Sequence, residues 1–184
     1  MKRAFALFLA LSLVFAVSAC GEAPSEPEPE VVTSTPEPTP TPEPEALAIG
    51  TEAALGDWAI TVTAFEWKDE IVDNYFSFTP GEGNKFAVVS IDISNNGKTA
   101  DTFLPSYGFG DDVFARIIYG DGYEFSATSL LGYDADIHDE YVNPLSSASG
   151  VIAFEIPASV VDDTAGALYI VFTAGEATAE YQLR

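Results

Sequence analysis

A period-two pattern of apolar and polar side chains near the middle of the chain limits its fold more than any other feature. The segment 86–94 has the sequence FAVVSIDIS. Successive side chains of an extended backbone point to opposite sides. One side therefore carries Ala87, Val89, Ile91 and Ile93, and the other carries Ser90, Asp92 and Ser94. This pattern predicts a β-strand with one face in a core and the other largely in water.

Seven further segments are rich in the β-branched and aromatic residues that strands favour. They are 58–67, 75–79, 113–119, 123–127, 150–156, 168–173 and 179–183. Turn-forming sequences such as Pro80-Gly81, Asn96-Gly97 and Gly120-Asp121-Gly122 separate them. Helical periodicity is nowhere sustained. About eight short strands at this spacing predict an all-β fold, an antiparallel β-sandwich.

Several of these strand-and-turn sequences also carry a family resemblance. They are Gly56-Asp57-Trp58 at the start of a strand, the strand and turn over 85–97, the turn 120–123, and the strand 149–157. Together they resemble the telokin-like domain of unknown function that is common in bacterial lipoproteins. The resemblance implies an immunoglobulin-like sandwich and a surface location, and it offers no catalytic residues.

The beginning of the chain predicts export. Lys2 and Arg3 precede an uncharged run over 4–19, which is the layout of a secretory signal peptide. The run has 16 residues, whereas a membrane-spanning helix needs about 20. We therefore predict that residues 1–19 are a lipoprotein signal peptide.

Cys20 is the only cysteine of the chain, so it has no partner for a disulfide. Val17-Ser18-Ala19-Cys20 resembles the bacterial lipobox, whose cysteine receives a diacylglycerol. An ordinary secretory signal with a free thiol is the alternative. We predict lipidation of Cys20, with palmitate among the acyl chains, and a location on the extracytoplasmic face of the cell membrane.

Residues 20–46 are predicted to be a disordered spacer. Eight prolines alternate there with Glu, Ser and Thr, and no aromatic residue is present. Proline removes a backbone donor and favours an extended chain, so no core can form. At about 3.1 Å per residue the segment reaches at most ~80 Å. A ligand for a PxxP-binding domain is the weaker alternative. Residues 47–184 then form one domain, the immunoglobulin-like β-sandwich.

The predicted domain is strongly acidic. Residues 47–184 contain 5 basic and 22 acidic side chains, a net charge of −17. Such a body repels nucleic acid and anionic polymers, which excludes nucleic-acid binding. Cations, cationic peptides and neutral surfaces remain as partners, and solubility alone is the competing explanation.

An acidic cluster between Tyr133 and Tyr141 is the candidate site. It contains Asp134, Asp136, His138, Asp139 and Glu140. Alternating carboxylates in a loop can direct several oxygens at one Ca²⁺ ion. The spacing differs from that of an EF-hand, and a zinc site would rest on a single histidine. The alternative is a solvated acidic loop, which is not part of the telokin-like pattern.

Catalysis has weak support in the sequence. His138 is the only histidine, and no G-x-S-x-G motif surrounds it. A Ser-His-Asp triad would need Ser and Asp to meet His138 in space. Many of the aromatic residues are expected to fill the core, whereas Tyr133 and Tyr141 are the predicted partner contacts.

The two tryptophans make a sharper prediction. Trp58 and Trp67 are nine residues apart in one predicted strand. An odd spacing places two side chains on opposite faces if the strand is regular.

These observations predict a non-catalytic binding module, anchored in the membrane through Cys20, that contacts a protein or peptide at the cell surface. No cofactor is expected. The alternatives are a calcium-stabilised surface protein that uses the loop 134–140 and an envelope hydrolase.

Overall fold

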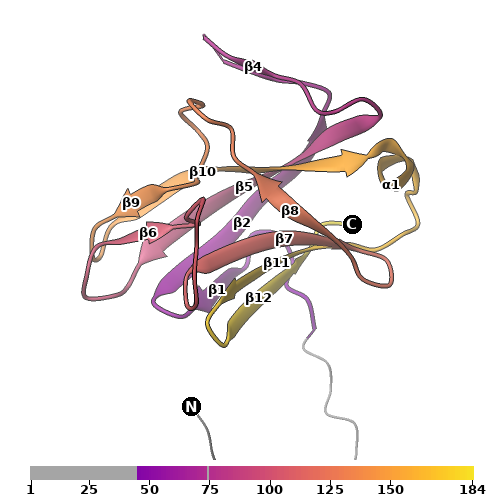
Figure 1. Ribbon diagram of the computed structural model, residues 1–184. Helices are drawn as coiled ribbons and strands as arrows, with labels where there is room; N and C mark the ends of the chain where they lie inside the picture. The colour runs from indigo at the N-terminus through magenta and orange to yellow at the C-terminus, as the bar shows by residue number, and fades with distance from the viewer. Residues whose placement is uncertain (1–44, 74) are drawn as a thin grey trace, which may run out of the picture. The chain divides into compact units, whose positions relative to one another are not determined.

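The computed structural model describes residues 45–73 and 75–184. The predicted signal peptide, Cys20 and nearly all of the predicted spacer lie outside the described residues. Eight strands form one antiparallel sheet that folds into two layers facing each other (Figure 1).

The first layer holds four strands in the order β1, β2, β5, β10. Their bounds are β1 (Glu52–Leu55), β2 (Trp58–Lys68), β5 (Asn84–Asn95) and β10 (Ser147–Pro157). The second layer has the order β8, β7, β11, β12. Its strands are β7 (Val113–Tyr119), β8 (Tyr123–Thr128), β11 (Leu168–Ala174) and β12 (Ala177–Gln182).

Strand pairing joins the two layers on one side, and on the other side Leu47, which precedes β1, is bonded to β12. On one side β10 pairs with the end of β8, where Phe154 lies opposite Ala127. On the other side Leu47 forms a parallel bridge to Tyr181 of β12. Leu47 N donates to Glu180 O at 2.8 Å, and Gln182 N donates to Leu47 O at 2.9 Å. These contacts limit the sheet edges that would otherwise be open.

The strand order identifies the sandwich as immunoglobulin-like. Without β1 and the short strands, β2, β5 and β10 take the positions of strands A, B and E, and β8, β7, β11 and β12 take those of C′, C, F and G. The predicted antiparallel β-sandwich is confirmed. β1 is an additional strand at the edge of the first layer, and it joins β2 through a two-residue turn that begins with Gly56 at φ +61°.

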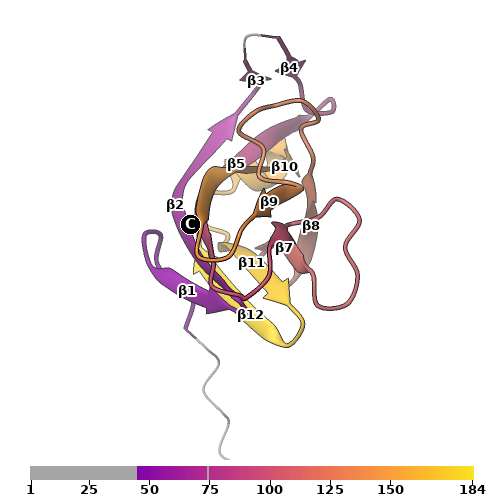
Figure 2. The same ribbon diagram turned by 90° about the vertical axis from the view of Figure 1, so that its left-hand side faces the viewer.

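Short elements lie around this frame. They are the hairpin of β3 (Ile71–Val72) and β4 (Ser77–Phe78), the pair of β6 (Asp101–Phe103) and β9 (Glu140–Val142), and the helix α1 (Ala158–Asp162). Figure 2 shows β3 and β4 at the end of the domain opposite to the point where the chain enters at residue 45. Within 45–73 and 75–184, no helix has the length and hydropathy to span a membrane.

The predicted inward face of β5 is confirmed. Ala87, Val89, Ile91 and Ile93 are at most 1 % exposed and pack in the main core. Burying a valine or isoleucine side chain contributes about 1.5–3 kcal/mol to the stability of the fold. The opposite face is less exposed than predicted at the beginning of β5, because Phe86 and Val88 are buried in a second apolar cluster. That cluster also contains Ile71, Leu130 and Ala153.

The prediction for the two tryptophans is wrong. The pairing of β2 with β5 shifts register between Val62 and Ala64, which marks a β-bulge. A bulge inserts one residue, so the side chains beyond it change face. Trp58 is buried, and Trp67 is half-buried but packs against the same main core. Both rings therefore lie on the inner face.

Several short elements differ from the predicted ones. The predicted strand 75–79 is reduced to β4, and β1 and α1 were not predicted. β1 has the sequence EAAL, which lacks β-branched and aromatic residues. β1 and β4 are held by pairing with their sequence neighbours β2 and β3, whereas α1 is held by the bond from Ala158 N to Gly83 O and by Val160 in the main core.

The buried Tyr181 predicts how the fold responds to alkali. Its hydroxyl lies 2.9 Å from Thr51 O and 3.0 Å from Ile60 O, both of which can accept its proton. Burial raises the pKa of Tyr181 to about 12. The unfolded phenol ionises near pH 10, so stability should fall as pH rises from about 10 toward 12.

Replacement Tyr181→Phe should lower the free energy of unfolding by about 1 kcal/mol at pH 7, because one buried hydrogen bond is lost. The replacement should also reduce the loss of unfolding free energy above pH 10. Urea unfolding at pH 7, 9 and 11 measures both effects. Tyr141→Phe is the control, since Tyr141 is 63 % exposed. An equal alkaline decline in wild type and Tyr181→Phe contradicts the prediction.

Candidate functional site

The segment between β8 and β9 is paired with the edge of β10 through a parallel bridge between Asp136 and Val151. Ile137 N donates to Val151 O at 3.1 Å, and Val151 N donates to Ala135 O at 2.7 Å. A Cβ at Gly150 would lie only 2.8 Å from Ala135 O, so a side chain there would push the segment away. Ile137 is 2 % exposed and belongs to the main core. The segment is thus a packed part of the domain.

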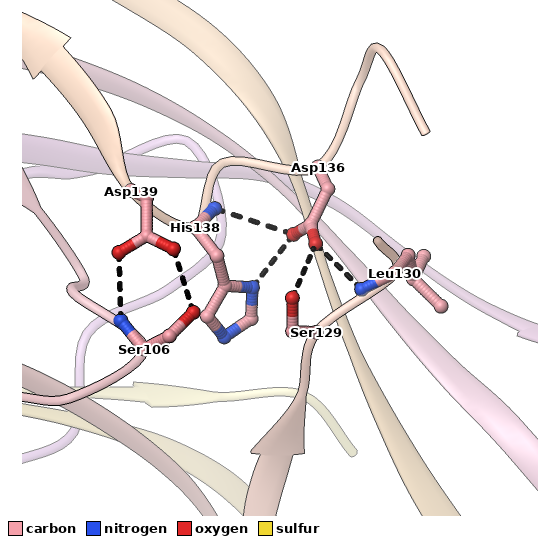
Figure 3. Close-up of polar contacts among 6 residues, drawn as sticks. All are labelled: Ser106, Ser129, Leu130, Asp136, His138 and Asp139. Atoms are coloured by element: carbon pink, nitrogen blue, oxygen red, sulfur yellow. Dashed lines mark hydrogen bonds and ion pairs between the residues drawn. The ribbon is translucent and has the colours of Figure 1, made fainter. Parts of the chain in front are cut away.

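Asp136 organises this segment through its carboxylate (Figure 3). Its Oδ2 accepts from Leu130 N at 2.6 Å and from Ser129 Oγ at 3.4 Å. Its Oδ1 lies 2.6 Å from His138 Nδ1 and accepts from His138 N at 3.2 Å. The side chains of His138 and Asp136 are only 8 % and 7 % exposed.

Electrostatics keeps Asp136 ionised. Burial alone would raise the pKa of its carboxyl group, but the hydrogen bonds from His138 and Leu130 N, together with the charge of His138, lower the pKa below 3.8. In the neutral form of the imidazole, donation from Nδ1 to Asp136 leaves Nε2 as the acceptor atom. This Asp-His pair has the arrangement that orients a general base.

Asp139 serves a different contact. Figure 3 shows it on the other side of the His138 ring, directed at Ser106. Its two oxygens accept from Ser106 N at 2.8 Å and from Ser106 Oγ at 2.7 Å. These two bonds lower the pKa of Asp139. Asp139 adopts φ +58°, a region that Asp tolerates better than most residues, and its carboxylate connects this segment to the loop 104–112.

The predicted oxygen cluster is not formed. Asp136 and Asp139 bind separate donors, Asp134 is exposed, and Glu140 is exposed in β9. In the described part of the chain no three His, Cys, Asp or Glu side chains meet as metal ligands would. The structure therefore brings together only Asp136 and His138 of the five candidates.

The two tyrosines chosen as partner contacts differ in exposure. Tyr141 is 63 % exposed. Tyr133 is half-buried and packs edge-on against Phe78, with ring centroids 6.2 Å apart. Tyr133 mainly supports the second cluster, and Tyr141 remains accessible.

An open cleft of about 650 Å³ lies beside the Asp-His pair. Its wall is the loop 104–109 together with His138, and its floor includes Phe114 and Arg116 from β7 and Ser126 from β8. Tyr107 and Phe109 at its rim are 89 % and 81 % exposed. Cβ at Gly108 would lie 3.1 Å from the Phe114 ring, so a glycine lets the loop approach that ring.

The sequence matches the family described as "Domain of unknown function (DUF4352)" over residues 47–177. The chain belongs to this family. Its membership confirms the predicted domain of unknown function, and the telokin-like name stays a prediction. No protein of curated function matches the chain significantly.

Two solved structures are similar to this DUF4352 domain in fold. One is an uncharacterized β-sandwich protein from Clostridium difficile 630, with 18 % identity, a TM-score of 0.57, and coverage of 80 % of this chain and 100 % of that chain. The other is a conserved hypothetical protein from Bacillus anthracis, with 15 % identity, a TM-score of 0.56, and coverage of 74 % and 94 %. These likenesses establish the β-sandwich and assign no activity.

The cleft of the DUF4352 domain does not contain a complete triad among the described residues. Ser106 Oγ donates to Asp139, and Ser129 Oγ donates to Asp136. Neither hydroxyl is hydrogen-bonded to His138 Nε2, as a serine nucleophile would be. His138, hydrogen-bonded to Asp136, forms one polar edge of the cleft, and the loop 104–112 is bonded through Ser106 to Asp139.

Sequence reasoning missed this cleft. Pro105-Ser106-Tyr107-Gly108-Phe109-Gly110 alternates aromatic residues with glycines, which is a sign of a loop that displays rings. No sequence pattern indicated that Arg116 lines a cleft, because the loop 104–109 lies over the outward face of β7 only in the folded domain.

Replacement Asp136→Asn tests whether the carboxylate holds the DUF4352 domain together. It should lower the free energy of unfolding at pH 7 by about 1–3 kcal/mol, because charge-assisted bonds to buried donors are lost. Since the pKa of Asp136 is lowered on folding, its contribution is present above pH 3.8 and lost as pH falls below it.

Chemical denaturation at pH 7 and pH 3 measures this effect. The gap between wild type and Asp136→Asn should shrink at pH 3. Asp134→Asn is the matched control, because Asp134 is exposed, and it should change stability by less than about 0.5 kcal/mol. Equal losses in the two variants argue against the assigned role of Asp136.

Proposed function

We propose that this protein is a non-catalytic binding module of the bacterial cell envelope, anchored through Cys20, which binds its partner in the cleft beside the loop 104–112. The observation that carries the proposal is the display of Tyr107 and Phe109, 89 % and 81 % exposed, at the rim of a 650 Å³ cleft. Exposed aromatic rings beside a concave surface are typical of binding sites.

The rigidity of the cleft supports this proposal. The loop 104–112 is held by the two bonds from Ser106 to Asp139 and by Phe109 N, which donates to Asp112 Oδ2 at 2.6 Å. A loop backbone held by such bonds loses less conformational entropy when a partner binds. The aromatic rim is thus already arranged for contact.

The alternatives have less support. A calcium-stabilised protein would need oxygens gathered near Asp134 and Asp136, and Asp136 is instead occupied by protein donors. The Asp-His pair favours an envelope hydrolase. Among the described residues, however, no serine hydroxyl is hydrogen-bonded to His138, as a nucleophile would be. The finer telokin-like assignment fits the immunoglobulin strand order.

The membrane anchor has a direct test. Replacement Cys20→Ser should abolish incorporation of labelled palmitate and release the protein from the membrane fraction of an expressing bacterium. Acyl chains contribute about 0.8 kcal/mol per buried methylene, and two chains hold a protein firmly. Ser25→Ala is the control in the spacer and should stay with the membrane. Membrane retention of the Cys20→Ser protein would mean that another segment anchors the chain.

Photo-cross-linking in intact cells tests binding in the cleft. A benzoylphenylalanine placed at Tyr107 should give a discrete adduct of increased mass, because this ring is predicted to touch the partner. The same group at Tyr123 is the control. Tyr123 is 69 % exposed but does not line the cleft. Absence of an adduct at Tyr107, or the same adduct at both positions, contradicts binding in the cleft.

A further inference from the structure

We propose that the ligand of the cleft is a peptide C-terminus, whose carboxylate binds Arg116 and whose last side chain packs among Tyr107, Phe109 and Phe114. This inference rests on the proposed binding function and specifies its ligand. The inference is based on the position of Arg116 in the cleft of a domain with a net charge of −17.

Arg116 differs from the other basic side chains of the domain. Lys68 and Lys85 lie 2.8 Å and 3.0 Å from the carboxylates of Glu66 and Asp69. Arg184 donates to the backbone oxygens of Gly166 and Val160. Lys98 is exposed and does not line the cleft. Among the described residues, Arg116 is thus the one Lys or Arg that lines the cleft.

The guanidinium of Arg116 has unused hydrogen-bonding capacity. Its Nε is buried and makes no hydrogen bond within the described residues. Glu124, which also lines the cleft, forms an ion pair with Arg116, but its Oε1 lies 3.8 Å from Nε, beyond hydrogen-bonding distance. Buried donors without acceptors are uncommon and call for an explanation. The side chain is 37 % exposed although Nε is buried, so a ligand in the cleft would meet side-chain atoms other than Nε.

A carboxylate is the ligand group that suits this arrangement. The planar guanidinium can donate two parallel hydrogen bonds to a carboxylate. Ser126 lies directly opposite Arg116 in the pairing of β7 with β8, so its hydroxyl is on the same face. Arg116 and Ser126 together offer donors to both oxygens of a chain terminus.

On the side of Phe114, the floor beside Arg116 is apolar. Phe114 precedes Arg116 by two residues on β7 and therefore lies on the same face. It is 40 % exposed, and the loop with Tyr107 and Phe109 stands over it. An apolar or aromatic side chain next to the bound carboxylate can be buried between these rings.

The charge of the domain favours a peptide over an anionic polymer. The domain carries a net charge of −17, which repels polyphosphates and other polyanions. A single terminal carboxylate brings one negative charge, which Arg116 compensates. Basic residues earlier in the peptide would be attracted by the surrounding carboxylates, so the ligand is expected to be a neutral or basic chain.

Calorimetry with the purified full-length protein tests the proposal. The probe is acetyl-Lys-Ala-Ala-Phe with a free C-terminal carboxylate, and the comparison ligand is the same peptide as its C-terminal amide. The acid should bind at least tenfold more tightly than the amide, a difference of about 1.4 kcal/mol. In Arg116→Gln the acid and the amide should bind equally. Arg116→Lys should keep part of the preference, because it retains the charge and loses the planar fork.

The matched control is Lys85→Gln, which removes an equal charge outside the cleft and should keep the full preference for the acid. Circular dichroism verifies that Arg116→Gln is folded. Equal affinity for acid and amide in the wild type overturns the proposal, as does equal competition by glycerol 3-phosphate, which would indicate a general anion site. If neither peptide binds but the adduct at Tyr107 forms, the carboxylate proposal fails and the binding function stands. If the adduct is also absent, both fail.

Discussion

One buried carboxylate holds the parts of the candidate site in register. Asp136 accepts from Leu130 N and from the backbone N and Nδ1 of His138, and this holds the segment between β8 and β9 beside the edge of β10, where Asp136 is bridged to Val151. The next carboxylate, Asp139, reaches the loop 104–112 through Ser106. The position of the aromatic rim therefore depends on a chain of contacts that begins in a desolvated acid. The strong acidity of the sequence thus has a structural use at these two positions.

The fold followed from the sequence where local patterns decide the structure. The inward set of β5 was correct because alternation dictates which side chains face the core. The faces of Trp58 and Trp67 were not, because the bulge between Val62 and Ala64 is fixed by pairing with β5 and leaves no local signal. The cleft was not predicted for the same reason. Arg116 of β7 and Tyr107 of the preceding loop line one cleft only in the folded domain, whereas the residues of the cluster 134–140 are neighbours in the sequence.

Acidic residues in this domain serve at least two purposes. Asp136 and Asp139 are committed to protein donors, and their depressed pKa values follow from those bonds. Exposed acids such as Asp134 have no such role and set the long-range field of the domain instead. That field surrounds Arg116, which already faces Glu124, with negative charge, and it therefore disfavours a cleft ligand that carries many negative charges.

The parallel bridge at Leu47 has a mechanical consequence. A pull on the chain at residue 45 runs along β12, because Leu47 is paired with Glu180 and Gln182 in the same chain direction. Such a pull loads both hydrogen bonds at once in shear instead of opening them one after the other. The buried ring of Tyr181, whose hydroxyl contacts Thr51 and Ile60, stiffens this junction from within. The domain is therefore built to bear tension at the end where its tether would attach.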